Sequence, residues 1–400
     1  MPRFIHVIRL LFWLLPLHIV AADELAVLTP AQAGMNEDTL RQIEPLIAAA
    51  MEQQQLPGCV VLIGRPAGIA WFKAYGNKRV APEQEAMSEE TVFDLASLTK
   101  PLATATSIFK LAEMQKLSID DPVEQYIPEF AVEGKGEITL RDLLVHRSGL
   151  IPDNPMSDYL DGPLKARERL FALKPTAPNR SSFKYSDVNF LVLGEIVARV
   201  SGESLSEFSR KRIYEPLGMK DTGYLPVESL RARAAPTVQR DGAWIQGKVH
   251  DPRAFRMEGV AGHAGLFGTA RDLAAYASDA LAGLHNDTSR ILNQASWQAM
   301  IEPHPIEAVD KDGKPTRDVR SPGWDVQSRY SSNRGKRLSA SSFGHGGFTG
   351  TSLWIDPDQS LFVIFLSNRL HPSGRGLVNP LIGKITDITV EALEKAQTSR

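Results

Sequence analysis

Two β-hairpin patterns, one near each end of this 400-residue chain, constrain the fold most strongly. Near the N-terminus, apolar residues 59–63 and 69–75 flank a Pro-Ala-Gly turn. Near the C-terminus, residues 352–355 and 361–366 flank the turn sequence Asp-Pro-Asp-Gln. Because an isolated hairpin is marginally stable, we expect the two hairpins to join in one sheet.

Helical patterns flank these hairpins and fill the middle of the chain. An amphipathic helix is predicted over residues 37–54, and a closing helix over residues 378–396. The sequence therefore predicts an α+β fold, with an antiparallel sheet built from residues 23–94 and 311–400 and flanked by the terminal helices. A mostly α-helical domain, residues 95–310, is inserted between them. A cleft between two such lobes is a usual place for a small-molecule site.

The first residues have the pattern of a secretory signal peptide. Arg3 and Arg9 precede an apolar run over residues 10–20, and small residues end at Ala22. The run is too short for a spanning helix, which needs about 20 residues. We expect residues 1–22 to be cleaved, leaving a periplasmic or secreted chain without a membrane span, although retention as an anchor stays open.

Composition excludes several other classes of protein. The formal net charge is -2, which argues against a nucleic-acid partner. One cysteine, Cys59, excludes an internal disulfide and a cysteine-based metal site. We expect structural roles for His146, His263 and a candidate hydrogen-bonded pair, His250–Asp251. No histidine pair has the spacing of a zinc-binding helix, so neither a metal nor a cofactor is expected.

Ser97 and Lys100 form a Ser-x-x-Lys pair at a predicted helix start that Pro101 marks. On a helix, this spacing puts both side chains on one face. A neutral lysine can then take the serine proton. Residues 102–117 are apolar on most sides, which predicts a buried helix whose N-terminal dipole favours developing negative charge.

Two other pairs share this spacing, Ser107 with Lys110 and Ser181 with Lys184. Ser107 lies in mid-helix, where its hydroxyl would bond a backbone carbonyl. Ser181 lies in a proline-flanked loop with no helix to orient its partner. Ser97 is therefore the preferred nucleophile, against a plain N-terminal serine beside a surface lysine.

Two further segments carry polar groups suited to catalysis. Tyr185 precedes an apolar helical stretch, residues 190–200, and can share a proton with a nearby lysine. The alternative is a half-buried tyrosine with Asp187 as the helix N-cap. Residues 343–350 place glycines around His345, which indicates close approach of a backbone or ligand, or else a glycine-rich bulge at a sheet edge.

The ordered motifs at Ser97, Tyr185 and His345 resemble those of the class C β-lactamase and penicillin-binding serine hydrolase family. The resemblance extends to three further segments, residues 142–150, 260–267 and 344–357. It implies a two-lobed fold and roles for individual residues. Ser97 would be the acyl-forming nucleophile and Lys100 its proton acceptor. Tyr185 would relay a proton to the leaving group and help activate the deacylating water. The backbone N–H groups of Ser97 and Phe348 would form the oxyanion hole.

This sequence departs from the family pattern at two positions. The substrate-binding set implied by the resemblance is Asp187, His345, Gly346 and Gly347. The family usually has Asn where Asp187 stands, and a carboxylate beside Lys100 raises the pKa of that lysine. It usually has Lys where His345 stands, and a mostly neutral histidine is a weaker anchor for a substrate carboxylate. Both changes argue against an efficient β-lactamase.

The expected function is that of an exported, cofactor-free serine hydrolase acting through an acyl-enzyme. The expected substrates are peptidoglycan peptides or fragments, cleaved as by a D-alanyl-D-alanine carboxypeptidase or a cell-wall amidase. One alternative is a secreted esterase of the same fold acting on short acyl esters. Another is a catalytically silent relative that binds wall fragments.

Overall fold

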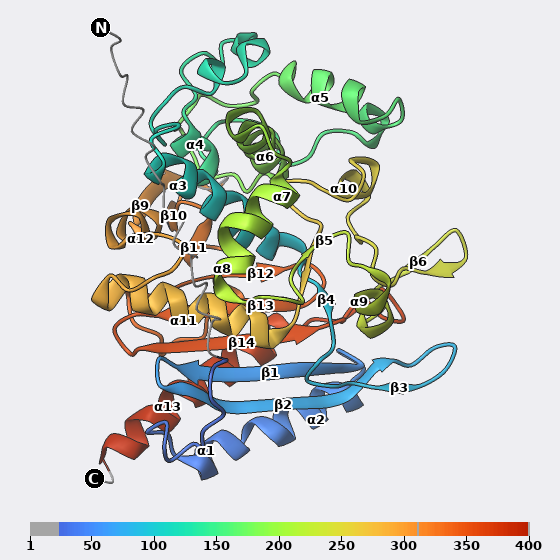
Figure 1. The fold of residues 1–400 in the computed structure, drawn as a ribbon, viewed down its shortest axis with the longest axis vertical. Helices are drawn as coiled ribbons and strands as arrows, with labels where there is room; N and C mark the ends of the chain where they lie inside the picture. Colours follow the sequence, from blue (N-terminus) through green and yellow to red (C-terminus); the bar gives the residue numbers. More distant parts are fainter. Residues whose placement is uncertain (1–23, 310–311, 399–400) are drawn as a thin grey trace, which may run out of the picture.

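A nine-stranded antiparallel sheet forms the centre of the computed structural model, which describes residues 24–309 and 312–398 (Figure 1). The strand order is β3-β2-β1-β14-β13-β12-β11-β10-β9. The strands are β1 Gly58–Arg65, β2 Gly68–Arg79, β3 Glu85–Ala86, β9 His304–Val309, β10 Pro315–Ser321, β11 Trp324–Gln327, β12 Phe343–Gly347, β13 Thr351–Asp356 and β14 Leu361–Ser367. The two predicted hairpins join where β1 pairs with β14, with Cys59 opposite Ser367. The predicted fold class is confirmed.

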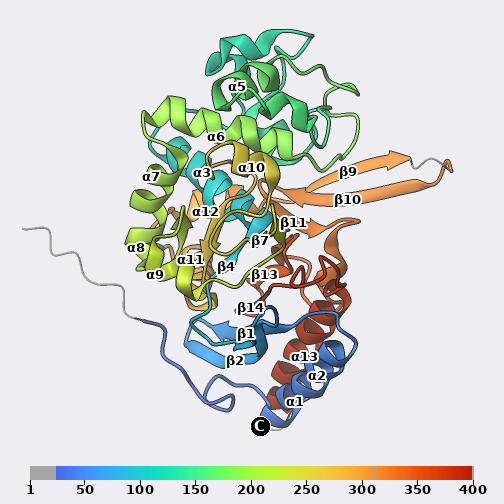
Figure 2. The same cartoon turned by 90° about the vertical axis from the view of Figure 1, so that its right-hand side faces the viewer.

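The sheet has helices on both faces (Figure 2). One face packs against α1 Glu37–Arg41, α2 Ile43–Glu52 and α13 Asn379–Thr398. The other face packs against α11 Ala270–Asn286. Successive residues of β1 alternate between two cores, Val60 facing the helical side and Val61 facing the terminal helices. Because both faces are covered, β1 has an almost continuous apolar sequence.

The other helices lie between the two halves of the sheet sequence. They are α3 Thr106–Glu113, α4 Leu140–Leu144, α5 Pro163–Phe171, α6 Asp187–Ser201, α7 Leu205–Ser209, α8 Glu215–Leu217, α9 Glu228–Arg233, α10 Pro252–Arg256 and α12 Gln294–Ile301. The same part of the chain contains short single-turn and wide-turn helices, namely η1 Ala96–Leu98, η2 Lys100–Ala105, η3 Val123–Gln125, η4 Pro128–Ala131, η5 Met156–Tyr159 and η6 Arg210–Tyr214. A further single turn, η7 Ser331–Asn333, lies between β11 and β12. Two small sheets complete the fold. One has three strands, β4 Phe93–Asp94, β5 Gly223–Tyr224 and β8 Leu266–Gly268. The other has two strands, β6 Gln239–Arg240 and β7 Ala243–Trp244.

The buried helix predicted over residues 102–117 is present, but it ends at Glu113 and its first part is not a regular α-helix. It begins as the wide-turn η2 and becomes the α-helix α3, which ends at Glu113. Pro101 has no N–H to donate, and the Thr106 hydroxyl donates to the Pro101 carbonyl at 2.8 Å. A side chain that bonds within the ladder is a recognised cause of such irregularity.

One alternative and one prediction in this region are wrong. The N-cap of α6 is Ser186, whose hydroxyl accepts from the Asn189 N–H at 3.3 Å, so Asp187 is the first helical residue. The hydroxyl of Ser107 has no hydrogen-bond partner among the described residues.

The domain division at residues 95 and 310 stays a prediction, and β9 already belongs to the sheet from His304. The predicted signal peptide, residues 1–22, lies outside the described residues. Over residues 24–309 and 312–398, no helix has both the length and the apolar character needed to cross a membrane.

Candidate active site

Ser97 lies in the short helix η1, directly after a turn that Asp94 holds in place. One carboxylate oxygen of Asp94 accepts from the Ala96 N–H at 2.9 Å, and the other accepts from the His250 N–H at 2.7 Å. Ala96 has a φ of 46°, a left-handed conformation that is unusual for a residue with a side chain. Burial raises the pKa of Asp94 to about 6. Asp94 therefore fixes the strained turn that presents Ser97.

Lys100 is fully buried behind Ser97 and bonds three oxygen atoms. Its Nζ lies 3.1 Å from Ser97 Oγ, 3.1 Å from the His263 carbonyl oxygen and 2.7 Å from Asp187 Oδ1. Burial lowers the pKa of Lys100, but the negative charge of Asp187 opposes this effect, and the net pKa is raised. In the resting protein Lys100 is therefore an ammonium ion.

Tyr185 precedes α6 and faces the same group. Its ring centroid lies 4.9 Å from Lys100 Nζ, and its buried hydroxyl has no hydrogen-bond partner among the described residues. Burial raises the pKa of Tyr185, and the positive charge of Lys100 offsets part of this rise. The phenol therefore keeps its proton.

His345 comes from β12 and is neutral. Its Nδ1 donates to the Gly346 carbonyl at 2.8 Å, whereas its buried Nε2 has no partner in the described chain. Burial and the nearby charges of Arg320 and Lys100 lower the pKa of His345 well below its ordinary range. His345 therefore offers an acceptor atom to the site, and it supplies no positive charge.

The end of β12 lies against the turn that carries Ser97. The Thr351 hydroxyl donates to the Leu95 carbonyl at 3.1 Å, and a Cβ on Gly347 would lie 2.6 Å from that same oxygen. Only a glycine allows this approach. Phe348 follows and is 60% exposed, with its ring stacked on His250 at a centroid distance of 5.6 Å.

A cavity of about 310 Å³ joins these elements. Six of the predicted site residues line it, namely Ser97, Tyr185, His345, Gly346, Gly347 and Phe348. The remaining two, Lys100 and Asp187, pair with each other next to Ser97 and do not line the cavity. The structure thus brings all the predicted site residues together.

Sequence reasoning missed two arginines in this cavity, Arg320 on β10 and Arg369 after β14. Arg320 is 1% exposed and pairs with Asp325 on the neighbouring strand β11 at 3.3 Å. No motif spacing pointed to them.

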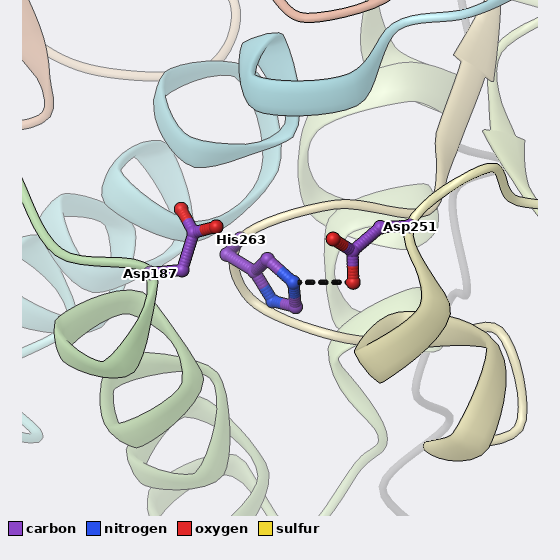
Figure 3. Close-up of side chains that lie close together, drawn as sticks. All are labelled: Asp187, Asp251 and His263. Atoms are coloured by element: carbon purple, nitrogen blue, oxygen red, sulfur yellow. Dashed lines mark hydrogen bonds and ion pairs between the residues drawn. The ribbon is translucent and has the colours of Figure 1, made fainter. Parts of the chain in front are cut away.

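His263 and Asp251 form a second pair of side chains close to Asp187 (Figure 3), which the sequence assigned to the wrong histidine. Asp251 Oδ1 lies 2.9 Å from His263 Nε2, whereas His250 bonds Asp94 through its backbone. The expected His250–Asp251 pair is therefore wrong. Asp251 also accepts from the Ala254 N–H at the start of α10. Burial raises the pKa of Asp251, but His263 and the backbone hydrogen bond lower it by more than burial raises it. The net pKa of Asp251 is therefore below its ordinary value.

Asp187, Asp251 and His263 are close enough to be considered as metal ligands. Each offers an atom within 4.8 Å of the others', and Figure 3 shows the three side chains converging from separate segments. Asp187 is already paired with the ammonium group of Lys100, and Asp251 is bonded to His263. Both carboxylates therefore already have partners within the described chain.

The chain is similar to a known protein family and to two bacterial proteins over most of its length. The Beta-lactamase family matches residues 43–386. A protein of Escherichia coli (strain K12), whose name proposes D-alanyl-D-alanine carboxypeptidase activity, is 30% identical over 393 residues, with 88% of each chain covered. The N-acetylmuramyl-L-alanine amidase of Bacillus subtilis (strain 168) is 28% identical over 385 residues, which cover 86% of this chain and 84% of the amidase.

Solved structures share the fold at lower identity. EstCE1, a hydrolase with promiscuous acyltransferase activity, aligns with a TM-score of 0.70 at 23% identity, over 88% of this chain and 99% of its own. A class C β-lactamase from Rhodobacter sphaeroides aligns with a TM-score of 0.66 at 21% identity, over 87% of this chain and 98% of the β-lactamase. With the family match spanning most of the sequence, the chain belongs to the Beta-lactamase family of serine hydrolases.

Proposed function

We propose that this protein is an exported serine hydrolase that cleaves peptidoglycan peptides or fragments through an acyl-enzyme on Ser97. The observation that carries the proposal is the 3.1 Å contact between Ser97 Oγ and Lys100 Nζ at the wall of the cavity. The names of two relatives, a carboxypeptidase for D-alanyl-D-alanine and a muramyl-L-alanine amidase, both describe amide bonds of the bacterial wall. The signal peptide pattern of residues 1–22 supports export.

In the proposed acylation step, Ser97 Oγ attacks the carbonyl carbon and the serine proton passes to neutral Lys100. The oxygen of the tetrahedral intermediate is held by the backbone N–H groups of Ser97 and Phe348. Tyr185 then delivers a proton to the leaving amine as the C–N bond breaks. Water then attacks the ester that joins the acyl group to Ser97. Tyr185 takes a proton from this water and Lys100 returns its proton to Ser97 Oγ, which frees Ser97.

The resting charge state places a condition on this mechanism. Asp187 keeps Lys100 protonated, so the base must first lose a proton before it can accept one from Ser97. The reactive fraction therefore grows with pH, and turnover near neutral pH is limited by the Asp187–Lys100 pair. Each oxyanion donor still contributes about 3 kcal/mol of barrier reduction.

Two observations favour the alternatives. The cavity entrance carries three exposed apolar side chains, Tyr330, Phe348 and Leu377, which suit a short acyl ester. The ion pair between Lys100 and Asp187 suits a catalytically silent relative that binds wall fragments.

Mass spectrometry of reaction products separates these possibilities. The mature protein would be incubated with an acyl-D-Ala-D-Ala peptide, with a muramyl-L-alanyl peptide and with a neutral p-nitrophenyl ester, beside the Ser97→Ala variant. Release of D-alanine or of a free peptide by wild type alone supports the proposal. Turnover of the ester alone supports the esterase, and turnover of none supports the silent relative.

A further inference from the structure

Arg320 is a buried guanidinium that shares the cavity with Ser97. It is 1% exposed on β10 and lines the same 310 Å³ space. Among the described residues that line this cavity, Asp325 is the sole carboxylate, against the two cations Arg320 and Arg369. His345 beside them is neutral. The cavity therefore has an excess of positive charge next to the predicted nucleophile.

Most of the hydrogen-bonding capacity of Arg320 is unused. Its Nη1 lies 3.3 Å from Asp325 Oδ1, whereas its Nε and Nη2 have no hydrogen-bond partner in the described chain. The other oxygen of Asp325 accepts from the Ser331 hydroxyl at 2.8 Å. A guanidinium has five N–H donors, and leaving buried donors unpaired is unfavourable. This edge of Arg320 is therefore available to a ligand.

Two other arginines of this chain show how the Nε and Nη2 atoms of a guanidinium group bind a carboxylate. Arg180 donates from Nε and Nη2 to the two oxygens of Asp142 at 2.8 and 2.9 Å. Arg141 holds Asp120 through the same two atoms at 2.7 and 2.9 Å. Nε and Nη2 together form a fork that matches the two oxygens of a carboxylate.

We propose that Arg320 binds a free carboxylate of the substrate through Nε and Nη2, and so selects acyl compounds with an acid group near the scissile bond. This inference names the substrate class of the proposed hydrolase and rests on that function. It assigns to Arg320 the anchoring task that the sequence had given to His345. Two wall structures carry such a carboxylate, a C-terminal D-alanine and a D-glutamate that follows the muramyl-linked L-alanine.

Binding to the Ser97→Ala variant tests this without requiring turnover. Calorimetry would compare N-acetyl-D-Ala-D-Ala with its C-terminal amide, and muramyl-L-Ala-D-Glu with its diamide, in which amides replace both carboxylates of the glutamate. We expect at least one acid to bind about ten- to a hundredfold more tightly than its amide, as for a hydrogen-bonded charge pair. The responding pair identifies the source of the carboxylate.

The variants Arg320→Gln and Arg320→Gln/Asp325→Asn should lose this preference, so that each acid and its amide bind with the same affinity. The double variant removes both charges, so it guards against a single variant that fails to fold. Arg329→Gln is the matched control, because Arg329 also pairs with an aspartate, Asp318, but is 53% exposed outside the cavity. It should keep the full preference.

Equal binding of acid and amide by the Ser97→Ala background would overturn the inference. The inference would also be overturned if the preference for the acid persisted in folded Arg320 variants, or if it disappeared only in Arg369→Gln. Failure of the proposed function has a different signature, in which the acid binds preferentially but wild type hydrolyses no wall fragment. Hydrolysis without an acid preference would leave the function standing and remove the role of Arg320.

Discussion

Lys100 Nζ lies 2.7 Å from Asp187 Oδ1, closer than its 3.1 Å separation from Ser97 Oγ. The residue expected to accept the serine proton is thus held by an anion. Solvent exposure of Lys100 is zero, so water does little to screen this attraction. In the proposed mechanism, the pair sets both the charge of the site and the pH at which the site works.

Asp187→Asn should shift the pH profile of activity. The anion raises the pKa of Lys100 and burial lowers it, so removing the anion leaves burial dominant and the pKa falls. We expect the acid limb of kcat/KM to move down by about one pH unit or more, since an opposite charge shifts a pKa by about 1–3 units. Ester hydrolysis from pH 6 to 10 measures the limb.

The control for that prediction is Asp187→Glu, which keeps the charge and should keep a high acid limb. An acid limb that does not move in Asp187→Asn would show that Lys100 is not the titrating base and would transfer that role to Tyr185.

Gly347→Ala should abolish most activity by displacing the Ser97 turn. The new Cβ would lie 2.1 Å from Thr351 Oγ1 and 2.6 Å from the Leu95 carbonyl, so the backbone must move. A displacement of about 1 Å can reduce the rate about a hundredfold. Gly346→Ala is the control, because its new Cβ would meet the side-chain amide of Asn333 at 2.7 Å and would not contact the turn that carries Ser97. Fluorophosphonate labelling rates should fall far more for Gly347→Ala, and equal rates would contradict the described packing.

His345→Lys should destabilise the protein and should not improve carboxylate binding. The sequence alone suggested that lysine would restore the family's anchor. The buried position already lies near the positive charges of Arg320 and Lys100, which lower the pKa of His345 after burial itself. An uncompensated buried charge costs about 3–5 kcal/mol. Urea denaturation should show this loss, and an equally stable variant with tighter acid binding would refute the charge assignment.

Asp251→Asn should weaken the fold above about pH 4. The native pKa of Asp251 is held below its ordinary value, so its ionised form stabilises the folded state above the unfolded pKa of about 3.9. That stabilisation disappears as pH falls through the native value. We expect a loss of about 1–3 kcal/mol at pH 7, typical for a buried polar partner. Denaturation at pH 7 and pH 3 tests the sign, since the difference from wild type should shrink in acid.

Local pattern was enough to predict the hairpins and the sheet that they form, whereas the grouping of Ser97 with Tyr185 and His345 was implied by the resemblance to the serine hydrolase family. Turn residues and apolar alternation are local signals, and ordered motifs carry their own spacing. Arg320 was out of reach because its partner Asp325 and its cavity are created by the pairing of β10 with β11. The choice of His263 over His250 as the partner of Asp251 likewise depends on how a loop returns to the site. Such contacts are tertiary, and no spacing encodes them.

The most direct test of an activated Ser97 is the intact mass of the protein after incubation with a fluorophosphonate, beside Ser97→Ala. Wild type should gain one adduct and the variant none, because the contact of Ser97 Oγ with Lys100 and the cavity make this serine reactive. An adduct that persists in Ser97→Ala would contradict the assignment of the nucleophile. No adduct on folded wild type at pH 9 would contradict catalysis itself and leave a protein that binds its ligand without cleaving it.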